Sequence, residues 1–157
     1  MNGKCSGMRY VHAWTCLGVL LAVGACRQGP HEELTSIKPY ADLIGVKYEV
    51  IADDVHAYGI YESPSDKTLI GVTVIAGVGI GGPEIAFKRH VPKGRAFTIL
   101  SAWRKRLLFE DGIYYRVAVD DSDLPRDVPI EVELFLGNKG VGADLNPNAY
   151  RKIARDN

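Results

Sequence analysis

The segment 77–82 is the first place where residue type and spacing suggest a chemistry, because closely spaced glycines can bring backbone N–H groups against a phosphate. The segment lacks the third spaced glycine that opens a nucleotide-binding helix, and Pro83 follows it at once. No Gly-Lys-Ser/Thr is present either. The pattern therefore favours a structural loop, and Gly79, Gly81 and Gly82 remain a candidate binding loop.

The other residues with catalytic or ligating side chains show no recognised spacing. His56 and His90 lie on different predicted strands, His31 precedes them in a polar stretch, and no helical pair of histidines is present to hold zinc. No serine lies in the Gly-x-Ser-x-Gly context of a hydrolase. The sequence singles out no catalytic residue, metal ligand or cofactor, although a pair of carboxylates from distant segments stays open.

An aromatic and basic stretch is the strongest candidate for a binding surface. Aromatic residues and arginine dominate the energetics of binding sites, and their mixture suits a glycan, a lipid headgroup or a protein partner. Trp103 shares the period of Phe97 and Ile99, however, which favours the core as the place for its ring. The candidate surface comprises Trp103, Arg104, Lys105, Arg106 and Tyr114.

The elements that must position these residues read as β-strands. Seven extended segments are separated by turn residues, which predicts a mostly β fold, a small antiparallel barrel or sandwich of about six or seven strands. Pro92 and Gly94 are expected at the second and fourth positions of a β-turn. The predicted strands are 46–50, 55–61, 69–75, 85–91, 97–103, 113–119 and 130–136.

Two further elements complete the predicted domain. Arg104 to Arg106 reads as a basic turn or edge that follows the strand containing Trp103, beside an apolar patch at 107–109. Asn146-Pro147 can cap and begin a short C-terminal helix that ends near Arg155.

The N-terminus has the features of an export signal. Lys4 and Arg9 form a positive region without acidic residues, and an apolar run of about 13 residues follows, which is too short to span a membrane. The run ends in Val23-Gly24-Ala25-Cys26. This ending resembles a bacterial lipobox, and the resemblance implies cleavage before Cys26 and acylation of its thiol and amine.

The lipobox divides the chain into a signal peptide over 1–25, a lipidated cysteine and tether over 26–38, and a β-rich domain over 39–157. About ten tether residues can extend roughly 33 Å, so the domain would stay near the membrane surface. By resemblance to the enterobacterial sorting rule, Arg27 does not retain the protein in the inner membrane, which favours the outer membrane facing the periplasm. The alternative is a plain secretory signal or an internal hydrophobic helix.

Composition limits the chemistry of the mature part. Of Cys5, Cys16 and Cys26, the first two would be removed and the third acylated, so the domain would keep no free thiol for a disulfide, a nucleophile or a zinc site. The mature chain has 17 basic and 19 acidic residues, a net charge of about −2. Neither its charge nor its expected location favours nucleic acid as a partner.

The stretch Val91 to Leu100, followed by Tyr114-Tyr115-Arg116-Val117, resembles the middle of bacterial Src-homology-three-like barrels. Those modules use a Pro-Lys-Gly turn, an alternating strand and then an aromatic strand, which implies a small barrel. The family's usual Asn-Val-Arg strand and closing Gly-Trp-Val are absent, so peptidoglycan binding is not carried over.

Together these patterns predict an envelope lipoprotein that is a binding or structural module and not an enzyme. Its partners would be the membrane, through the lipid anchor, and another envelope protein or a glycan. Two alternatives stay open: an envelope hydrolase acting on cell-wall or lipid substrate, and a periplasmic inhibitor that inserts the loop 77–83 into an enzyme cleft. A concave pocket with converging polar side chains of perturbed protonation would favour the hydrolase.

Overall fold

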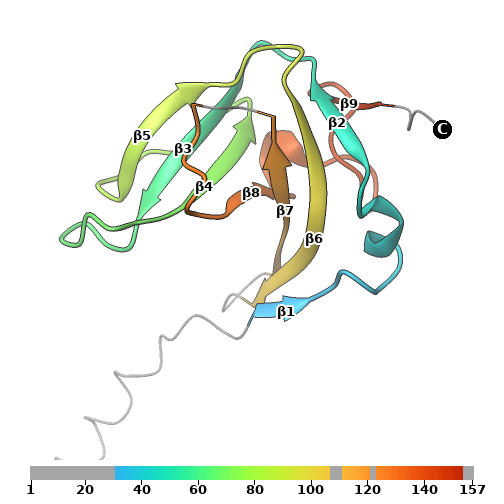
Figure 1. Cartoon of the computed structure of the whole chain (residues 1–157), viewed down its shortest axis with the longest axis horizontal. Helices are drawn as coiled ribbons and strands as arrows, with labels where there is room; N and C mark the ends of the chain where they lie inside the picture. The colour runs from blue at the N-terminus through green and yellow to red at the C-terminus, as the bar shows by residue number, and fades with distance from the viewer. Residues whose placement is uncertain (1–30, 107–110, 121–122, 154–157) are drawn as a thin grey trace, which may run out of the picture.

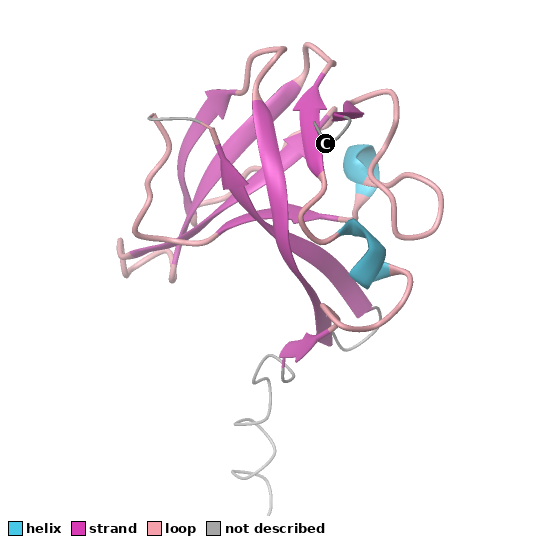
Figure 2. Ribbon diagram, turned by 45° about the vertical axis from the view of Figure 1, so that its right-hand side comes forward, coloured by secondary structure: helices cyan, strands magenta, loops and turns pink. Residues whose placement is uncertain are grey.

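The computed structural model describes residues 31–106, 111–120 and 123–153, and the described chain is mostly β-sheet, as predicted (Figure 1). In Figure 2 the strands curve around a common interior. The helical elements of the described residues are two short 3₁₀ helices. Within the described residues, no helix is long and apolar enough to cross a membrane. The elements are β1 (His31–Glu33), η1 (Tyr40–Leu43), β2 (Lys47–Val50), β3 (Val55–Tyr61), β4 (Leu69–Ala76), β5 (Ile85–His90), β6 (Ala96–Arg106), β7 (Asp111–Val119), β8 (Ile130–Glu133), η2 (Leu136–Asn138) and β9 (Tyr150–Ile153).

The nine strands found in the described residues form one mixed sheet in the order β5-β3-β4-β8-β7-β6-β2-β9, with β1 also paired to β6. The sheet does not close into a barrel, because β5 and β9 are its two edges. β4 and β8 pair in parallel, and the other pairs are antiparallel. The predicted antiparallel fold of six or seven strands therefore gains β1 and β9 and one parallel pair.

The core lies on the inner side of the curved sheet, where residues of several strands meet. Fully buried examples are Val50, Ala57, Ile99, Tyr115 and Val132, each from a different strand. In β2 the buried residues have the period-two pattern that the sequence predicts for a strand with one buried face.

The segment between β7 and β8 covers part of the open side of the sheet. Leu124 is buried in the core, while the Arg89 guanidinium of β5 donates a hydrogen bond to the carbonyl of Asp123. Arg95 donates to the carbonyl of Asp120 at 2.6 Å. Arginine side chains from β5 and the turn after it thus satisfy two backbone carbonyls of this segment, and the predicted acidic loop is thereby part of the fold.

The domain begins earlier than the sequence predicts. His31–Glu33, expected in the tether, forms β1 and pairs with Trp103–Lys105 of β6. Leu34 is buried, and its N–H donates to the carbonyl of Ala102 at 2.8 Å. The prediction missed this strand because three polar residues, a histidine and two glutamates, carry no hydrophobic period.

A β-bulge in β6 overturns the predicted place of Trp103. The register with β7 shifts between Ile99 and Ser101, so Leu100 is extra and the later residues change face. Ala102 is fully buried, and Trp103 is only partly buried on the outer side. Trp103 therefore does not share a face with Ile99.

The predicted C-terminal helix is also absent from the described residues. The Asn146 carbonyl accepts hydrogen bonds from the N–H groups of Ala149 and Tyr150, which makes a single turn. The chain then continues as β9, because the free edge of β2 pairs with Tyr150–Ile153 and buries the Tyr150 ring. A strand edge that offers a full ladder of hydrogen bonds outweighs a local capping signal.

The turn between β5 and β6 lies at the top of Figure 1 and differs from the prediction by one residue. The N–H of Arg95 donates to the carbonyl of Pro92 at 3.2 Å, so Pro92 is the first residue of the turn and Gly94 the third. Gly94 has φ +82°, which a type II turn requires at its third position.

Candidate functional site

Trp103 lies on the outer side of β6 among polar residues from neighbouring strands. Its indole Nε1 donates to Ser101 Oγ at 2.8 Å, and the Arg116 guanidinium lies 4.8 Å from the ring centroid. The strand register explains the arrangement, because Trp103 faces Tyr114 and Ser101 faces Arg116 across the β6–β7 pair. The cation over the indole fixes both side chains on one face.

β1 adds a histidine to this face. His31 Nδ1 lies 2.6 Å from the Tyr114 hydroxyl oxygen, and the two rings pack edge to face with centroids 5.9 Å apart. Burial raises the pKa of the Tyr114 hydroxyl, and the nearby carboxylate of Glu131 adds to the increase. Tyr114 therefore stays protonated and holds β1 against the sheet.

β8 adds a carboxylate. Glu131 Oε1 lies 3.4 Å from Arg116 Nε, a long contact for an ion pair. Burial raises the pKa of Glu131, although Arg116 acts in the opposite direction. We call His31, Trp103, Tyr114, Arg116 and Glu131 the Trp103 cluster.

The structure brings together part of the predicted binding surface. Trp103 and Tyr114 are direct neighbours, and Lys105 lies two residues beyond Trp103, opposite His31 in the register. The residues 104–106 are not a turn or edge, because they lie within β6 and pair with β7.

Arg104, another basic residue of the predicted surface, does not join the cluster. Arg104 alternates to the other face of β6, where its Nη1 lies 3.2 Å from Glu32 Oε2. Arg106 pairs through its backbone with Asp111. The apolar patch predicted at 107–109 lies outside the described residues.

A groove adjoins the cluster between β7 and the segment 124–130. It has a volume of about 360 Å³ and shares Arg116 with the Trp103 cluster. Arg126 is exposed on the opposite wall. Most of the other lining residues are apolar, including Leu100, Val119, Leu124, Val128, Pro129 and Ile130. We call this the Leu100 groove, because the bulge residue Leu100 is 54% exposed at its edge.

Sequence reasoning missed His31, Arg116, Glu131 and Leu100. The period-two pattern of β7 already places Arg116 on the face of Tyr114, so it could have been found. The period of two also places Leu100 on the outer face, next to buried Ile99, but it does not show that a groove lies beside Leu100.

The predicted binding loop lies on another part of the sheet. A Cβ on Gly79 would overlap the hydroxyl oxygen of Tyr58, so the loop packs directly on β3. Gly81 has open space around it, and Gly82 has φ +155°. A residue without a side chain is therefore required at position 79 for the loop to pack on Tyr58.

The histidines of β3 and β5 are closer than the sequence indicates. His56 and His90 are opposite each other in the strand register, with ring centroids 5.7 Å apart. In the described part of the chain, no group of three or more His, Cys, Asp or Glu side chains is arranged to hold a metal ion.

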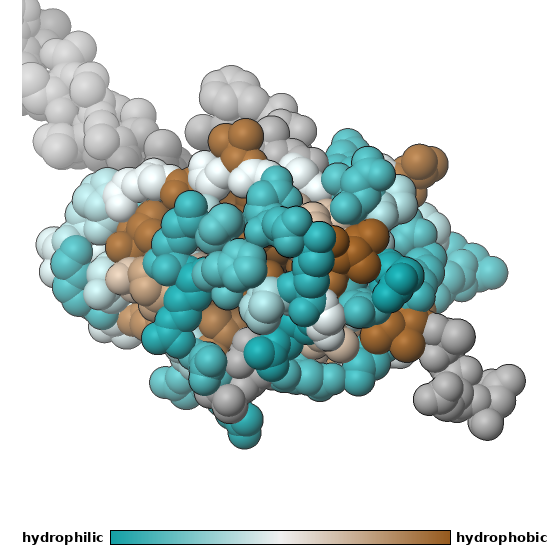
Figure 3. Space-filling model, turned by 90° about the horizontal axis from the view of Figure 1, so that it is seen from above, coloured by the Kyte–Doolittle hydropathy of each residue, from teal (hydrophilic) through white to brown (hydrophobic). Residues whose placement is uncertain are grey.

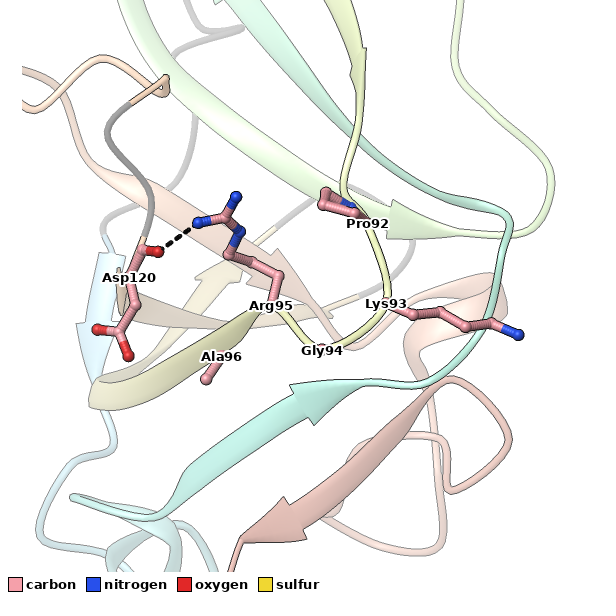
Figure 4. A pocket seen from close by; sticks show the side chains of 6 residues that line it. All are labelled: Pro92, Lys93, Gly94, Arg95, Ala96 and Asp120. Atoms are coloured by element: carbon pink, nitrogen blue, oxygen red, sulfur yellow. Dashed lines mark hydrogen bonds between the residues drawn. The ribbon is translucent and has the colours of Figure 1, made fainter.

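A second, polar pocket of about 350 Å³ lies at the turn between β5 and β6 (Figure 4). Arg95 points toward the carbonyl of Asp120, whose carboxylate pairs with Lys47 at 2.7 Å. Lys93 points away from the pocket and pairs with Asp53 at 2.9 Å. These charges already have partners within the chain, which makes the pocket a weaker candidate than the Leu100 groove.

The view from above shows a mostly hydrophilic surface with separate apolar areas (Figure 3). The large apolar residues exposed across the described domain include Ile37, Ile70, Val78, Leu100, Phe135 and Val141. Among these, Leu100 lies beside a groove flanked by arginines. Cys26, the predicted lipid attachment residue, lies outside the described residues. No protein-family model, curated protein or solved structure matches this chain.

Proposed function

We propose that the chain is a lipoprotein of the bacterial envelope, anchored through Cys26, and that its β domain binds another envelope protein through the Leu100 groove. The outer membrane, facing the periplasm, is the proposed location. The domain is a binding module in this proposal and carries no catalytic residue.

The observation that carries the proposal is the composition of the groove. Its lining is mostly apolar and includes two arginines, one of which is held in place by the Trp103 indole. Apolar surface gives affinity when water is displaced from it, and arginine and tryptophan are the residues most often essential in interfaces. A groove of this kind fits a protein segment with apolar side chains and an acidic residue.

The long contact between Arg116 and Glu131, together with the charge of Arg126, also favours an acidic partner. Arg116 has an internal partner in Glu131, but their 3.4 Å contact is long and Glu131 holds its proton more readily than an exposed glutamate. A carboxylate from a partner can therefore replace Glu131 at Arg116 with little loss. Arg126, on the opposite wall, can attract the same partner electrostatically.

The position of β1 supports a close attachment. Four residues separate Cys26 from His31, so an anchored chain can extend roughly 17 Å from the lipidated residue to the first strand. The predicted tether was about twice as long. Because β1 pairs with β6 beside Trp103, the Trp103 cluster would lie near the membrane, where envelope partners embedded in it are within reach.

Site-specific photocrosslinking in intact membranes tests the groove. A crosslinking amino acid at Leu100 should form an adduct with a defined envelope protein, and one at Val141 should not, although Val141 is 90% exposed. Arg126→Glu should abolish the adduct, and Arg126→Lys should retain it, because the positive charge attracts the partner. Identical adducts at both positions, or an adduct indifferent to Arg126→Glu, would contradict the proposal.

Labelling with palmitate tests the anchor. Wild type and Cys16→Ser should incorporate the label, and Cys26→Ser should not, because the lipobox resemblance assigns the thioether to Cys26. Equal labelling of the two cysteine variants would refute the anchor without bearing on the groove.

The partly buried carboxyl of Glu131 favours a second candidate, an envelope hydrolase. Glu131 and Glu133 lie on the same face of β8, and burial raises the pKa of Glu131 toward that of a general acid. In this alternative, Glu131→Gln abolishes hydrolysis of cell-wall material while Glu62→Gln, in the exposed turn after β3, does not. The binding module predicts no hydrolysis by the wild type.

A further inference from the structure

The segment 77–82 covers a buried hydroxyl group. Tyr58, in the middle of β3, is 1% exposed. Its hydroxyl oxygen is buried and has no hydrogen-bond partner within the described residues. The backbone of Gly79 lies against that oxygen so closely that a side chain there would overlap it. The closed segment therefore excludes water from a polar group and supplies no hydrogen bond in return.

This arrangement is unfavourable for the closed segment. A buried polar group without a partner costs about 1–3 kcal/mol. The segment regains little of this through packing, because Val78 is 78% exposed and a Cβ on Gly81 would touch nothing within 4 Å. Few contacts therefore hold the segment over Tyr58, and displacing it costs little free energy.

The ends of the segment have the backbone conformations of hinges. Gly77 has φ +79° and Gly82 has φ +155°, a region that residues with side chains rarely adopt. The carboxylates of Asp54 and Glu84 lie beside these two glycines. Between the hinges, the chain can move away from β3 without strain in a regular element.

The surroundings of Tyr58 on this face are basic. In the register of β3 and β5, Tyr58 faces Lys88 and His56 faces His90. Lys88 Nζ lies 5.7 Å from the centroid of the Tyr58 ring, and the His56 ring lies 6.3 Å away. An ammonium group, two imidazoles and a hydroxyl donor thus share one face of two strands.

Apart from the carboxylates of Asp54 and Glu84 at the two ends of the flap, the acid near the two histidines is Asp53, which is neutralised. The carboxylate of Asp53 pairs with Lys93 at 2.9 Å, and its backbone carbonyl lies 2.9 Å from His90 Nε2. The carbonyl of Asp54 likewise lies 3.3 Å from His56 Nδ1. A carbonyl only accepts, so both imidazoles donate to the backbone, and these contacts fix the rings beside Tyr58.

We propose that the segment 77–82 is a flap over an oxyanion-binding site formed by Tyr58 and Lys88. When the flap moves, the Tyr58 hydroxyl donates to an oxygen of a carboxylate or phosphate group, and the Lys88 ammonium pairs with its charge. The ligand gains the hydrogen bond that the closed flap withholds. The site lies on β3 and β5, shares no residue with the Leu100 groove, and does not depend on the function proposed above.

Two glycines of the flap give a matched test. Gly79→Ala places a methyl group against the Tyr58 hydroxyl and should keep the flap open, whereas Gly81→Ala adds the same group where nothing lies near. Titration of the full chain in detergent with inorganic phosphate and with acetate, at constant ionic strength, measures binding. Gly79→Ala should bind several-fold more tightly than wild type, because the cost of opening is removed, and Gly81→Ala should match wild type.

The ligating residues are tested in the same titration. Tyr58→Phe and Lys88→Gln should each weaken binding about tenfold, the loss of one charge-assisted hydrogen bond or ion pair. The stronger of the two anions identifies the ligand as a carboxylate or a phosphate. Equal affinities of Gly79→Ala and Gly81→Ala, no effect of Tyr58→Phe, or no binding of either anion would overturn the proposal.

Hydrogen exchange on the wild-type chain gives a measurement that does not depend on any variant folding. Binding of the preferred anion should speed exchange of the amides of residues 78–81, because the ligand holds the flap away from β3. Exchange at the end of β9 serves as the internal control and should not change. Unchanged or slower exchange in the flap on addition of the anion would also overturn the proposal.

Discussion

The region around β2 and β9 and the region around β3 and β5 both bury tyrosine rings, but they differ in what they offer the hydroxyl groups. Tyr48 donates to Asp144 Oδ1 at 2.5 Å, Tyr115 to the carbonyl of Ala143 at 2.5 Å, and Tyr150 to Asn138 Oδ1 at 2.6 Å. Tyr58, which is just as buried, donates to nothing among the described residues.

The difference follows from what covers each ring. The segment 138–149 covers the first region with carbonyl, carboxamide and carboxylate oxygens, and Gly137 packs so closely on the carbonyl of Ala76 that a Cβ would not fit. The flap covers Tyr58 with glycines that offer it no acceptor. The segment 138–149 is joined to the sheet by hydrogen bonds, whereas the flap lies on the sheet with few contacts.

The largest effect is expected from a substitution of Asn138, which lies at the centre of the hydrogen bonds in the first region. Asn138 is fully buried and donates to the carbonyls of Val74 and Glu133, while its Oδ1 accepts from Ala76 N–H and Tyr150. Asn138→Ala leaves these groups buried without partners. We expect a loss of about 3 kcal/mol or more in the free energy of unfolding, measured with urea.

The matched control is Asn148→Ala, which changes an exposed asparagine in the same segment. It should alter the free energy of unfolding by less than about 0.5 kcal/mol. If Asn138→Ala were as mild as this control, the segment 138–149 would not be fixed by its hydrogen bonds, and the contrast with the flap would disappear.

A smaller effect is expected at Tyr48. Burial of the Asp144 carboxyl raises its pKa, but hydrogen bonds from Lys152 and Tyr48 outweigh burial and bring the pKa below its usual 3.8. A lowered pKa in the folded state means that the stabilisation is present above 3.8 and is lost as pH falls through the folded pKa. Tyr48→Phe should cost about 1–2 kcal/mol at neutral pH.

Unfolding measured over a range of pH tests the cause of the Tyr48→Phe effect as well as its size. Wild type should lose more stability than Tyr48→Phe between neutral pH and a pH well below 3.8, because the variant has less of this interaction to lose. Urea unfolding of both proteins across that range measures the difference. Parallel curves would show that Tyr48 does not stabilise the ionised form of Asp144.

The sequence predicts the strands of both regions better than it predicts the segments that cover them. Alternation over 46–50 identifies β2 almost to the residue, because one buried face imposes a period of two, and the aromatic and aliphatic residues of Val55–Tyr61 identify β3. It does not identify β9, which forms because the edge of β2 is available. Pairing between segments about 100 residues apart leaves no local pattern.

The candidate sites show the same limit. Trp103 and Tyr114 could be chosen from residue type, and the structure places them side by side. The Leu100 groove depends on the return of the segment 124–130 to the sheet, which composition does not reveal. Gly79 was visible as part of a glycine-rich loop, but the reason for it, the Tyr58 hydroxyl, requires the fold.

The smallest effect on the free energy of unfolding is expected at Tyr58, and it is an increase. Tyr58→Phe removes a hydroxyl that is buried without a partner, so the free energy of unfolding should rise by about 1 kcal/mol, where the same change at Tyr48 lowers it. Paired urea unfolding of the two variants measures the contrast directly. A loss at Tyr58 as large as the loss at Tyr48 would mean that its hydroxyl is satisfied in the closed state. The flap would then resemble the segment 138–149, because the closed flap would leave no polar group without a hydrogen-bond partner.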